Sequence, residues 1–322
     1  VGLATPVALA AGLNKAARNH ILIRDTSALE QMRNVDVVVF DKTGTLTEGH
    51  PTVIGWLWAQ GQEEHYKDVL LAAESTSDHP LAEAIVTALE GEEQVIPAHL
   101  DGFESIAGKG VRVAYQGAEY WVGSHKLLKD YQANLSDILA DMLTQYESDG
   151  NSIVYFGREN DLLAVIAIKD QLRVTSMEAI RELRIQDIEI CMLTGDGERT
   201  ASSVAGSLGI MRFVADAMPD DKEDFIHKLQ LQGKTVAMVG DGVNDARALS
   251  CADVSIAMGK GTDTLMDTAM ITLRTSDLLL LPKVFRLSRQ TVSLMYRNLF
   301  WAFIYNTVGI FVAAGVLYPV YD

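Results

Sequence analysis

The 322-residue sequence is short of cysteine and of positive charge. Its two cysteines, Cys191 and Cys251, lie in apolar surroundings without CxxC spacing. We therefore expect both to be buried small side chains in a reducing compartment, rather than metal ligands or a disulfide. Lys and Arg together number 27 against 43 Asp and Glu, which gives a formal net charge of −16. A surface of this charge disfavours nucleic acid as a partner.

The sequence also has no low-complexity tract, and 48% of its residues are apolar. This length and composition predict a folded protein with room for two ordinary domains. No basic stretch precedes the apolar residues at the N-terminus, so a signal peptide is not expected. The chain opens on Val1 rather than methionine. We expect residues 1–14 to be the end of a transmembrane helix.

A long uncharged run occupies residues 299–319 near the C-terminus. A helix over these about 21 residues would match the ~30 Å hydrocarbon core of a bilayer. Arg286, Arg289 and Arg297 precede the run, as is typical of the cytoplasmic side of a membrane span. We therefore expect residues 284–322 to form a transmembrane helix region. A buried core helix is the alternative, although such helices rarely stay apolar on every face.

Between the two ends, short apolar runs rich in β-branched residues alternate with helical patterns. Predicted strands cover residues 35–40, 162–168, 188–193, 235–239 and 252–258. Predicted helices between the later strands cover residues 176–183, 199–208 and 221–231. Strands that alternate with helices in this way indicate a parallel α/β sheet.

Residues 53–160 do not follow this alternation. Their strand candidates at 110–117 and 120–124 predict a hairpin, beside helices at 66–74 and 81–90. A separate domain inserted into the first explains the change of pattern most simply. The first domain would then comprise residues 15–52 and 161–283.

Polar residues follow three of the predicted strands directly. Asp41, Thr194 and Asp241 each stand just past a strand end, where the loops of a parallel sheet converge. Carboxylates of Asp41, Asp241 and Asp245 would suit Mg²⁺, which prefers oxygen ligands. Lys222 offers a charge to neutralise a phosphoryl group. A single aspartate at a strand end is usually a turn or cap residue, but three together favour a phosphate and magnesium site.

Four motifs carry a resemblance to a known family. "DKTGTLTEG", "MLTGD", "MPDDK" and "VGDGVNDARAL" occur in this order, and the chain resembles the P-type ATPases of the haloacid dehalogenase superfamily. "DHPLAEAIV" and "NLFWAFIYN" are similar to the heavy-metal pumps of the copper and silver type. The resemblance implies a Rossmann-like phosphorylation domain, an inserted α+β nucleotide-binding domain and flanking transmembrane helices.

The resemblance also implies a role for each residue of the motifs. Asp41 is the residue that ATP phosphorylates, and the other implied catalytic residues are Lys42, Thr43, Thr194, Gly195, Asp196, Lys222 and Asn244. Asp41, Asp241, Asp245 and the backbone carbonyl of Thr43 are implied magnesium ligands. Thr194, Gly195 and Lys222 would hold phosphate oxygens and spread transition-state charge.

Thr43 is informative because it is not an acid. In phosphatases of the superfamily, the acid two places after the nucleophile protonates the leaving group and then activates water. A threonine cannot do so, and the aspartyl phosphate is expected to persist. Persistence suits a pump, in which a conformational step separates phosphorylation from hydrolysis.

In the inserted domain, the resemblance implies an ATP site at Glu74, His79, Gly108 and Gly110. His79 would lie against adenine, and the glycines would let the backbone approach the nucleotide closely. Three residues depart from the family pattern. Ser124 stands where many members have Asn, Gly197 replaces a common Asn, and Arg247 replaces a common Pro. We expect the Arg247 side chain to face solvent.

The implied transport site lies in the predicted span. Tyr305 and Asn306 are consecutive polar residues there, and an unpaired polar group in a membrane is usually functional. In the copper branch this pair contributes to the transport site. The implied cargo is Cu⁺, with Ag⁺ as the alternative, and a copper chaperone is an expected partner. The side chains alone would not select copper, because Cu⁺ prefers thiolate and thioether ligands.

Three readings therefore stand at this point. A copper-pump fragment, set in the lipid bilayer with its catalytic domains in the cytoplasm, predicts the insert, Thr43 and the span. A free-standing phosphatase predicts Asp at position 43 and no span. An inactive nucleotide-binding module predicts damage at Asp41, Lys222 or Asp241, which the sequence does not show. A Cys-Pro-Cys motif and an actuator domain are absent, so we expect the catalytic part of a longer pump.

Overall fold

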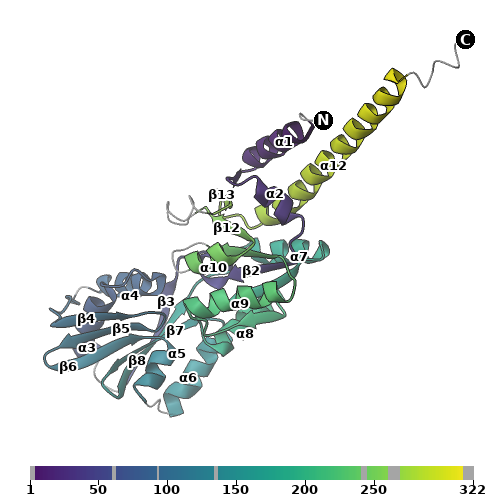
Figure 1. Cartoon of the computed structure of the whole chain (residues 1–322). Coiled ribbons are helices and arrows are strands. Elements are labelled where there is room, and N and C mark those ends of the chain that lie inside the picture. The colour runs from purple at the N-terminus through teal and green to yellow at the C-terminus, as the bar shows by residue number, and fades with distance from the viewer. Residues whose placement is uncertain are drawn as a thin grey trace, which may run out of the picture.

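The computed structural model describes residues 4–59, 63–92, 94–133, 137–240, 245–259 and 269–314. Two β-sheets organise these residues, one of seven strands and one of six. Helices pack on both sheets, and a long helix extends away from the body toward the C-terminus (Figure 1). The α/β class expected from the sequence is confirmed.

The seven-stranded sheet has the order β1-β13-β12-β11-β2-β9-β10. Neighbouring strands run parallel except β1 and β13, which pair antiparallel at one edge. The strands are β1 (Ile21–Ile23), β2 (Val37–Asp41), β9 (Glu189–Leu193), β10 (Arg212–Val214), β11 (Val236–Gly240), β12 (Val254–Met258) and β13 (Ile271–Leu273). The predicted strands at 35–40, 188–193, 235–239 and 252–258 are thus confirmed.

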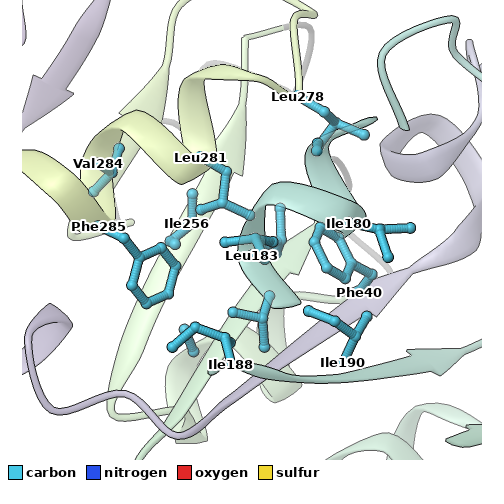
Figure 2. Close-up of a cluster of buried hydrophobic side chains, with 14 of the residues drawn as sticks. Phe40, Ile180, Leu183, Ile188, Ile190, Ile256, Leu278, Leu281, Val284 and Phe285 are labelled. Atoms are coloured by element: carbon cyan, nitrogen blue, oxygen red, sulfur yellow. The ribbon is translucent and has the colours of Figure 1, made fainter. Parts of the chain in front are cut away.

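Helices cover both faces of this sheet. They are α1 (Ala4–Arg18), α2 (Ser27–Met32), α7 (Ser176–Ile185), α8 (Glu198–Leu208), α9 (Pro219–Leu231), α10 (Ala246–Cys251) and α12 (Leu280–Ala313). Val38 and Phe40 of β2 point to the face covered by α7, α8 and the start of α12, and Figure 2 shows part of that core. Val37 and Val39 point to the face covered by α9 and α10. Strand β2 is therefore buried on both sides, as a central parallel strand should be.

The six-stranded sheet is antiparallel, with the order β3-β8-β7-β6-β5-β4. Its strands are β3 (Thr52–Trp58), β4 (Gly102–Ile106), β5 (Gly110–Tyr115), β6 (Ala118–Gly123), β7 (Ser152–Arg158) and β8 (Asp161–Lys169). Its helices are α3 (Glu63–Glu74), α4 (Pro80–Glu90), α5 (His125–Asp130) and α6 (Asp137–Ser148). Residues of α3 and α4 share one core with the sheet, and residues of α5 share another. The predicted hairpin of β5 and β6 is confirmed.

One predicted strand forms but was assigned to the wrong sheet. The run at 162–168 forms β8, but β8 pairs with β3 and β7 in the antiparallel sheet. Its residues 162–168 are buried on both faces because this strand lies inside a sheet covered by helices on both sides. A continuous apolar run therefore identified a buried strand without telling a parallel sheet from an antiparallel one.

The two terminal helices lie side by side, and α12 projects beyond the end of α1 (Figure 1). Among the helices that the structure describes, none is long and apolar enough to cross a membrane. The described residues confirm neither the end of a transmembrane helix expected at 1–14 nor the transmembrane helix region expected at 284–322. Of the apolar run, only residues 299–314 are described, fewer than the ~20 that a spanning helix needs.

The prediction for cysteine was right at one position and wrong at the other. Cys191 is fully buried in β9, but Cys251 is partly exposed at the end of α10. Both thiols are free. The apolar neighbours of Cys251 in the sequence did not reveal that a helix end would bring it to the surface.

Candidate active site

Asp41 is the last residue of β2, at the carboxyl edge of the parallel sheet. The strand reaches this edge buried on both faces, and Asp41 itself is only 6% exposed. The chain then turns through Lys42–Leu46, where Gly44 has φ +72°. A left-handed residue at this point reverses the chain immediately after the carboxylate. The turn holds Asp41 at the carboxyl edge of the parallel sheet.

Two residues that the sequence analysis missed hold this turn. Arg173 donates to the carbonyl oxygens of Gly44, at 2.5 Å, and Thr45, at 2.9 Å. Asp170 lies 2.5 Å from Thr47 Oγ1 and accepts a bond from the backbone N–H of Gly49. Both residues follow β8, so an acid and a base after a predicted strand end were the available signal. They attach the Asp41 turn to the connection between the two sheets.

Lys222 lies between two carboxylates. Its Nζ is 2.5 Å from Asp41 Oδ1 and 2.7 Å from Asp245 Oδ1, and all three side chains are buried. Burial lowers the pKa of Lys222, but the charges and hydrogen bonds of Asp41 and Asp245 outweigh it, and the net shift is upward. Lys222 is therefore a fixed ammonium. Two carboxylates facing one ammonium leave an excess negative charge at the site.

A second buried ion pair joins the DKTGT motif to the MLTGD motif. Lys42 Nζ lies 2.5 Å from Asp196 Oδ2 and donates to Ser152 Oγ at 3.0 Å. Thr194 Oγ1 donates to Asp196 Oδ2 at 2.9 Å and accepts from the Asp196 backbone. Burial raises the pKa of Asp196, but the charge of Lys42 and these hydrogen bonds hold the pKa below its usual value. The ion pair anchors the loop that carries Thr194 and Gly195 beside the Asp41 turn.

The oxygen donors near Asp41 suit a magnesium ion. Asp245 lies directly over the end of β11, since a Cβ on Gly240 would come within 3.0 Å of Asp245 Oδ2. The carboxylates of Asp41 and Asp245 thus converge from two neighbouring strand ends, with a negative excess that a divalent cation would balance. Carboxylate oxygens are what Mg²⁺ prefers in proteins. Asp241 and Asn244, also predicted here, lie outside the described residues.

The residues predicted to bind the nucleotide lie on the six-stranded sheet and its helices. Glu74 ends α3, is 6% exposed, and burial raises the pKa of its carboxyl to about 7. His79 caps α4, where its Nδ1 accepts the Leu81 N–H. Gly108 and Gly110 form the turn between β4 and β5, with φ of +66° and +143°. Ser124 has a buried hydroxyl without a hydrogen-bond partner among the described residues.

This part of the molecule closes onto the Asp41 site. A Cβ on Gly108 would lie 2.7 Å from the Sδ of Met218, which directly precedes α9. Lys126 Nζ donates to the carbonyl oxygen of Asp216 at 2.5 Å. Loss of hydration next to the surrounding protein lowers the pKa of His79. The charges that act on this imidazole belong to the Asp41 site: Asp196 and Asp41 raise its pKa, and Lys222 and Lys42 lower it. The structure therefore brings the two predicted sites to face one another.

Other predicted residues lie elsewhere. Tyr305 and Asn306 are exposed on the projecting part of α12, and Asn306 donates to the carbonyl of Ala302 at 2.7 Å. The Arg247 side chain is 62% exposed, as expected, and it pairs with Asp220 and Glu223. A Cβ on Gly197 would meet nothing within 4 Å, so the structure gives no reason for glycine there.

The comparisons with known proteins cover almost all of the chain. The family model of haloacid dehalogenase-like hydrolases matches residues 35–253. The chain is 41% identical, over 99% of its length, to the copper-exporting P-type ATPase of Legionella pneumophila. It is 40% identical, over the same share, to that of Staphylococcus epidermidis. It spans 43% and 40% of these relatives, so it corresponds to less than half of their length.

Solved structures give the same assignment. A zinc-transporting PIB-type ATPase in its E2·Pi state superposes with a TM-score of 0.64 and 36% identity, covering 98% of this chain and 50% of that one. The catalytic domain of the CPx-ATPase CopB-B superposes with a TM-score of 0.70 and 28% identity, covering 85% of this chain and 97% of that one. The second match is nearly complete in both directions.

Proposed function

We propose that this chain, which belongs to the haloacid dehalogenase-like hydrolases, transfers the γ-phosphoryl group of ATP to Asp41. Within that family it corresponds to the catalytic part of the heavy-metal P-type ATPases. The reaction would drive export of a copper ion by the pump to which this catalytic part belongs. One observation carries the proposal above the others: a buried ammonium, Lys222, is held between Asp41 and Asp245 at adjoining strand ends, 2.5 and 2.7 Å away.

The chemistry follows from this arrangement. An Asp41 oxygen attacks the γ-phosphorus, the bond to the β-γ bridging oxygen breaks, and ADP leaves with that electron pair. Lys222 is already beside the attacking oxygen, so it neutralises charge on the transferred group without reorganisation. The Thr194 hydroxyl and the backbone N–H of Gly195 supply further hydrogen bonds. The ion pair of Lys42 with Asp196 positions their loop rather than touching phosphate.

Asp41 and Asp245 would hold the magnesium ion, together with the Thr43 carbonyl and Asp241, and Asn244 would orient the phosphate. When bound, magnesium would offset the negative charge of the phosphate oxygens. Since Thr43 stands where a phosphatase has its general acid, the aspartyl phosphate persists. This lifetime gives a pump time for its conformational step.

The proposed nucleotide domain is the antiparallel sheet with its helices, and the proposed phosphorylation domain is the parallel sheet. Glu74, His79, Gly108 and Gly110 would bind ATP. Support comes from the facing of His79 and Gly108 toward the Asp41 site. In the proposed pump, Cu⁺ or Ag⁺ is the cargo, Tyr305 and Asn306 contribute to its site in the lipid bilayer, a chaperone delivers it, and both catalytic domains are cytoplasmic.

The test is phosphate labelling of the chain with magnesium and γ-labelled ATP. We expect an acid-stable, hydroxylamine-sensitive label on the parent chain and none on Asp41→Asn. Asp149→Asn changes an exposed residue that directly follows α6. This variant is the matched control and should label normally. Label that survives in Asp41→Asn would overturn the assignment of the nucleophile. Rapid release of many phosphates per molecule by the parent chain would favour a phosphatase.

A further inference from the structure

A second group of metal-ligating side chains lies between α9 and α10, outside the residues assigned to phosphoryl transfer. Glu223 and His227 stand one turn apart on α9, and Cys251 is the last residue of α10. One potential ligand atom from each residue lies within 4.8 Å of the other two. Thiolate, imidazole and carboxylate are the three ligand types that zinc sites in proteins use.

Gln230 orients two of these three residues. Its Oε1 lies 3.2 Å from Nδ1 of His227, and its Nε2 donates to the backbone carbonyl of Cys251 at 2.9 Å. An amide oxygen can only accept, so the neutral imidazole carries its proton on Nδ1. The lone pair of His227 is therefore on Nε2, the nitrogen that lies 3.8 Å from Glu223 Oε1. Hydrogen bonds of this kind fix the ring of metal-binding histidines.

Arg247 orients the third residue. Its guanidinium forms an ion pair with Glu223 Oε2 at 2.9 Å and also pairs with Asp220. This contact occupies one carboxylate oxygen and leaves Oε1 on the side of His227. The positive charge beside Oε2 holds the Glu223 carboxylate in place, while Oε1 remains available as a metal ligand. The residue at 247 is thus part of the local arrangement, although the side chain is mainly in solvent.

We propose that Glu223, His227 and Cys251 form a three-ligand site for a divalent ion of the zinc class, which joins α9 to α10. Zinc bonds of ~2.0–2.3 Å place tetrahedral ligand atoms roughly 3.3–3.8 Å apart, so small side-chain rotations close the present spacing. On binding, the thiol S–H bond breaks, the Sγ–metal bond forms and the proton leaves to solvent. A water molecule takes the fourth position, because His227 and Glu223 are 52% and 26% exposed.

The donor set favours zinc over the copper ion proposed as cargo. Cu⁺ selects thiolate and thioether, and a carboxylate oxygen adds little to its binding. Zinc uses all three donors. The contribution of Glu223 therefore separates the two metals, since its loss should weaken zinc binding and leave Cu⁺ binding nearly unchanged.

The position of the site gives it a consequence for the reaction, which rests on the proposed function. Lys222 directly precedes Glu223 on α9, and Asp245 is the N-terminal cap of α10. A metal that joins the two helices fixes the Lys222 ammonium against the Asp245 carboxylate. Metal occupancy should then change the rate at which Asp41 is phosphorylated, while metal binding itself can be measured without ATP.

The experiment is a titration of the untagged chain with Zn²⁺ against a chromophoric chelator, in excess Mg²⁺ so that the carboxylates at Asp41 are occupied. Co²⁺ serves as a spectroscopic probe, and a thiolate-to-cobalt charge-transfer band is expected. Cys251→Ser and His227→Gln should each weaken zinc binding by at least about 100-fold, and Gln230→Ala by about 10-fold. His99→Gln changes an exposed histidine just before β4 of the antiparallel sheet. This variant is the matched control and should bind zinc normally.

Thermal unfolding with and without Zn²⁺ provides the second measurement. Zinc that binds the folded chain should raise the unfolding midpoint of the parent and of His99→Gln, and should not raise it in Cys251→Ser. Equal zinc affinity in the parent and in both ligand variants would overturn the site. Binding of Cu⁺ alone, insensitive to Glu223→Gln, would overturn the choice of zinc. Zinc binding without any change in labelling would remove only the consequence for Asp41.

Discussion

The two sheets of this chain present functional residues in opposite ways. At the carboxyl edge of the parallel sheet, Asp41, Lys42, Lys222 and Asp245 are all buried and paired with opposite charges. On the helices that cover the antiparallel sheet, His79 is exposed and Glu74 is buried, with a pKa raised to about 7 by that burial. The first set is held rigidly by its own charges. The second lies at the ends of two helices and at one backbone turn.

This difference suits the two tasks that we propose. Phosphoryl transfer depends on electrostatic groups fixed before the reaction, which buried ion pairs provide. Holding a nucleotide that must enter and leave each cycle needs a surface that can open. We therefore expect substitutions at the parallel sheet to act on rates, and substitutions at the antiparallel sheet to act on affinity and on the pH dependence of stability.

The largest effect is expected at Thr43, where the site at the edge of the parallel sheet has no acidic side chain. Thr43→Asp places a carboxylate two residues after Asp41, so it should shorten the lifetime of the phosphorylated chain by about 10²–10⁴-fold, the range of general acid–base catalysis. Thr43→Asn has a similar shape without the acid and serves as the control. The measurement is the decay of label after excess unlabelled ATP is added. Equal decay in both variants would show that the missing acid does not set the lifetime.

A smaller effect on rate is expected from the central ammonium. Lys222→Met removes the charge between Asp41 and Asp245, and phosphorylation should slow by about 10²–10³-fold, as when one transition-state donor is lost. The loss of this ammonium from two buried carboxylates should also cost roughly 3–5 kcal/mol of unfolding free energy. Lys228→Met, an exposed position on the same helix, is the control. Labelling rates and urea unfolding test both effects, and a full rate in Lys222→Met would contradict the mechanism.

The sequence was a good guide to the parallel sheet and to its motifs. Four of its strands follow from apolar runs, and Asp41 and Thr194 stand at or just past the ends of two of them. Lys222 and Asp245, which lie beside Asp41 in the structure, were identified by their motifs. The sheet to which β8 belongs did not follow, because an apolar run says nothing about its pairing partners. Asp170 and Arg173 were missed because their role is to bind backbone carbonyl and amide groups, which no side-chain motif records.

The antiparallel sheet was less predictable for a physical reason. Its nucleotide residues are scattered over α3, α4 and one turn, and only tertiary packing brings Gly108 against Met218. The surface cluster at Cys251 was missed in the same way. Its ligands come from two helices, and the spacing of Glu223 and His227 alone is ordinary for a solvated helix face.

A pH dependence should distinguish the antiparallel sheet from the parallel one. The pKa of Glu74 is about 7 in the folded chain and 4.5 for an unperturbed carboxyl. The folded state therefore retains the proton longer, and its stability falls by roughly 3 kcal/mol as the pH rises from below 4.5 to above 7. Glu74→Gln should remove this loss, and Glu83→Gln, exposed on α4, should not. Urea unfolding at about pH 5 and about pH 8 measures it. An unchanged pH dependence in Glu74→Gln would contradict the burial of its charge.

The smallest effect lies where the two regions touch. Gly108 and Gly117 are both turn glycines with positive φ, +66° and +75°, so alanine at either position meets the same backbone strain of about 1–2 kcal/mol. They differ in surroundings: a Cβ at Gly108 would lie 2.7 Å from Met218 Sδ, whereas a Cβ at Gly117 meets nothing within 4 Å. Gly108→Ala should therefore weaken ATP-dependent labelling of Asp41 by roughly 5–10-fold, a cost of about 1–1.4 kcal/mol, while Gly117→Ala leaves labelling intact. Because the clash is with a flexible side chain, adding Met218→Ala should restore most of the loss. Equal labelling by the two glycine variants would mean that the approach of Gly108 to Met218 plays no part in delivering the phosphoryl group to Asp41.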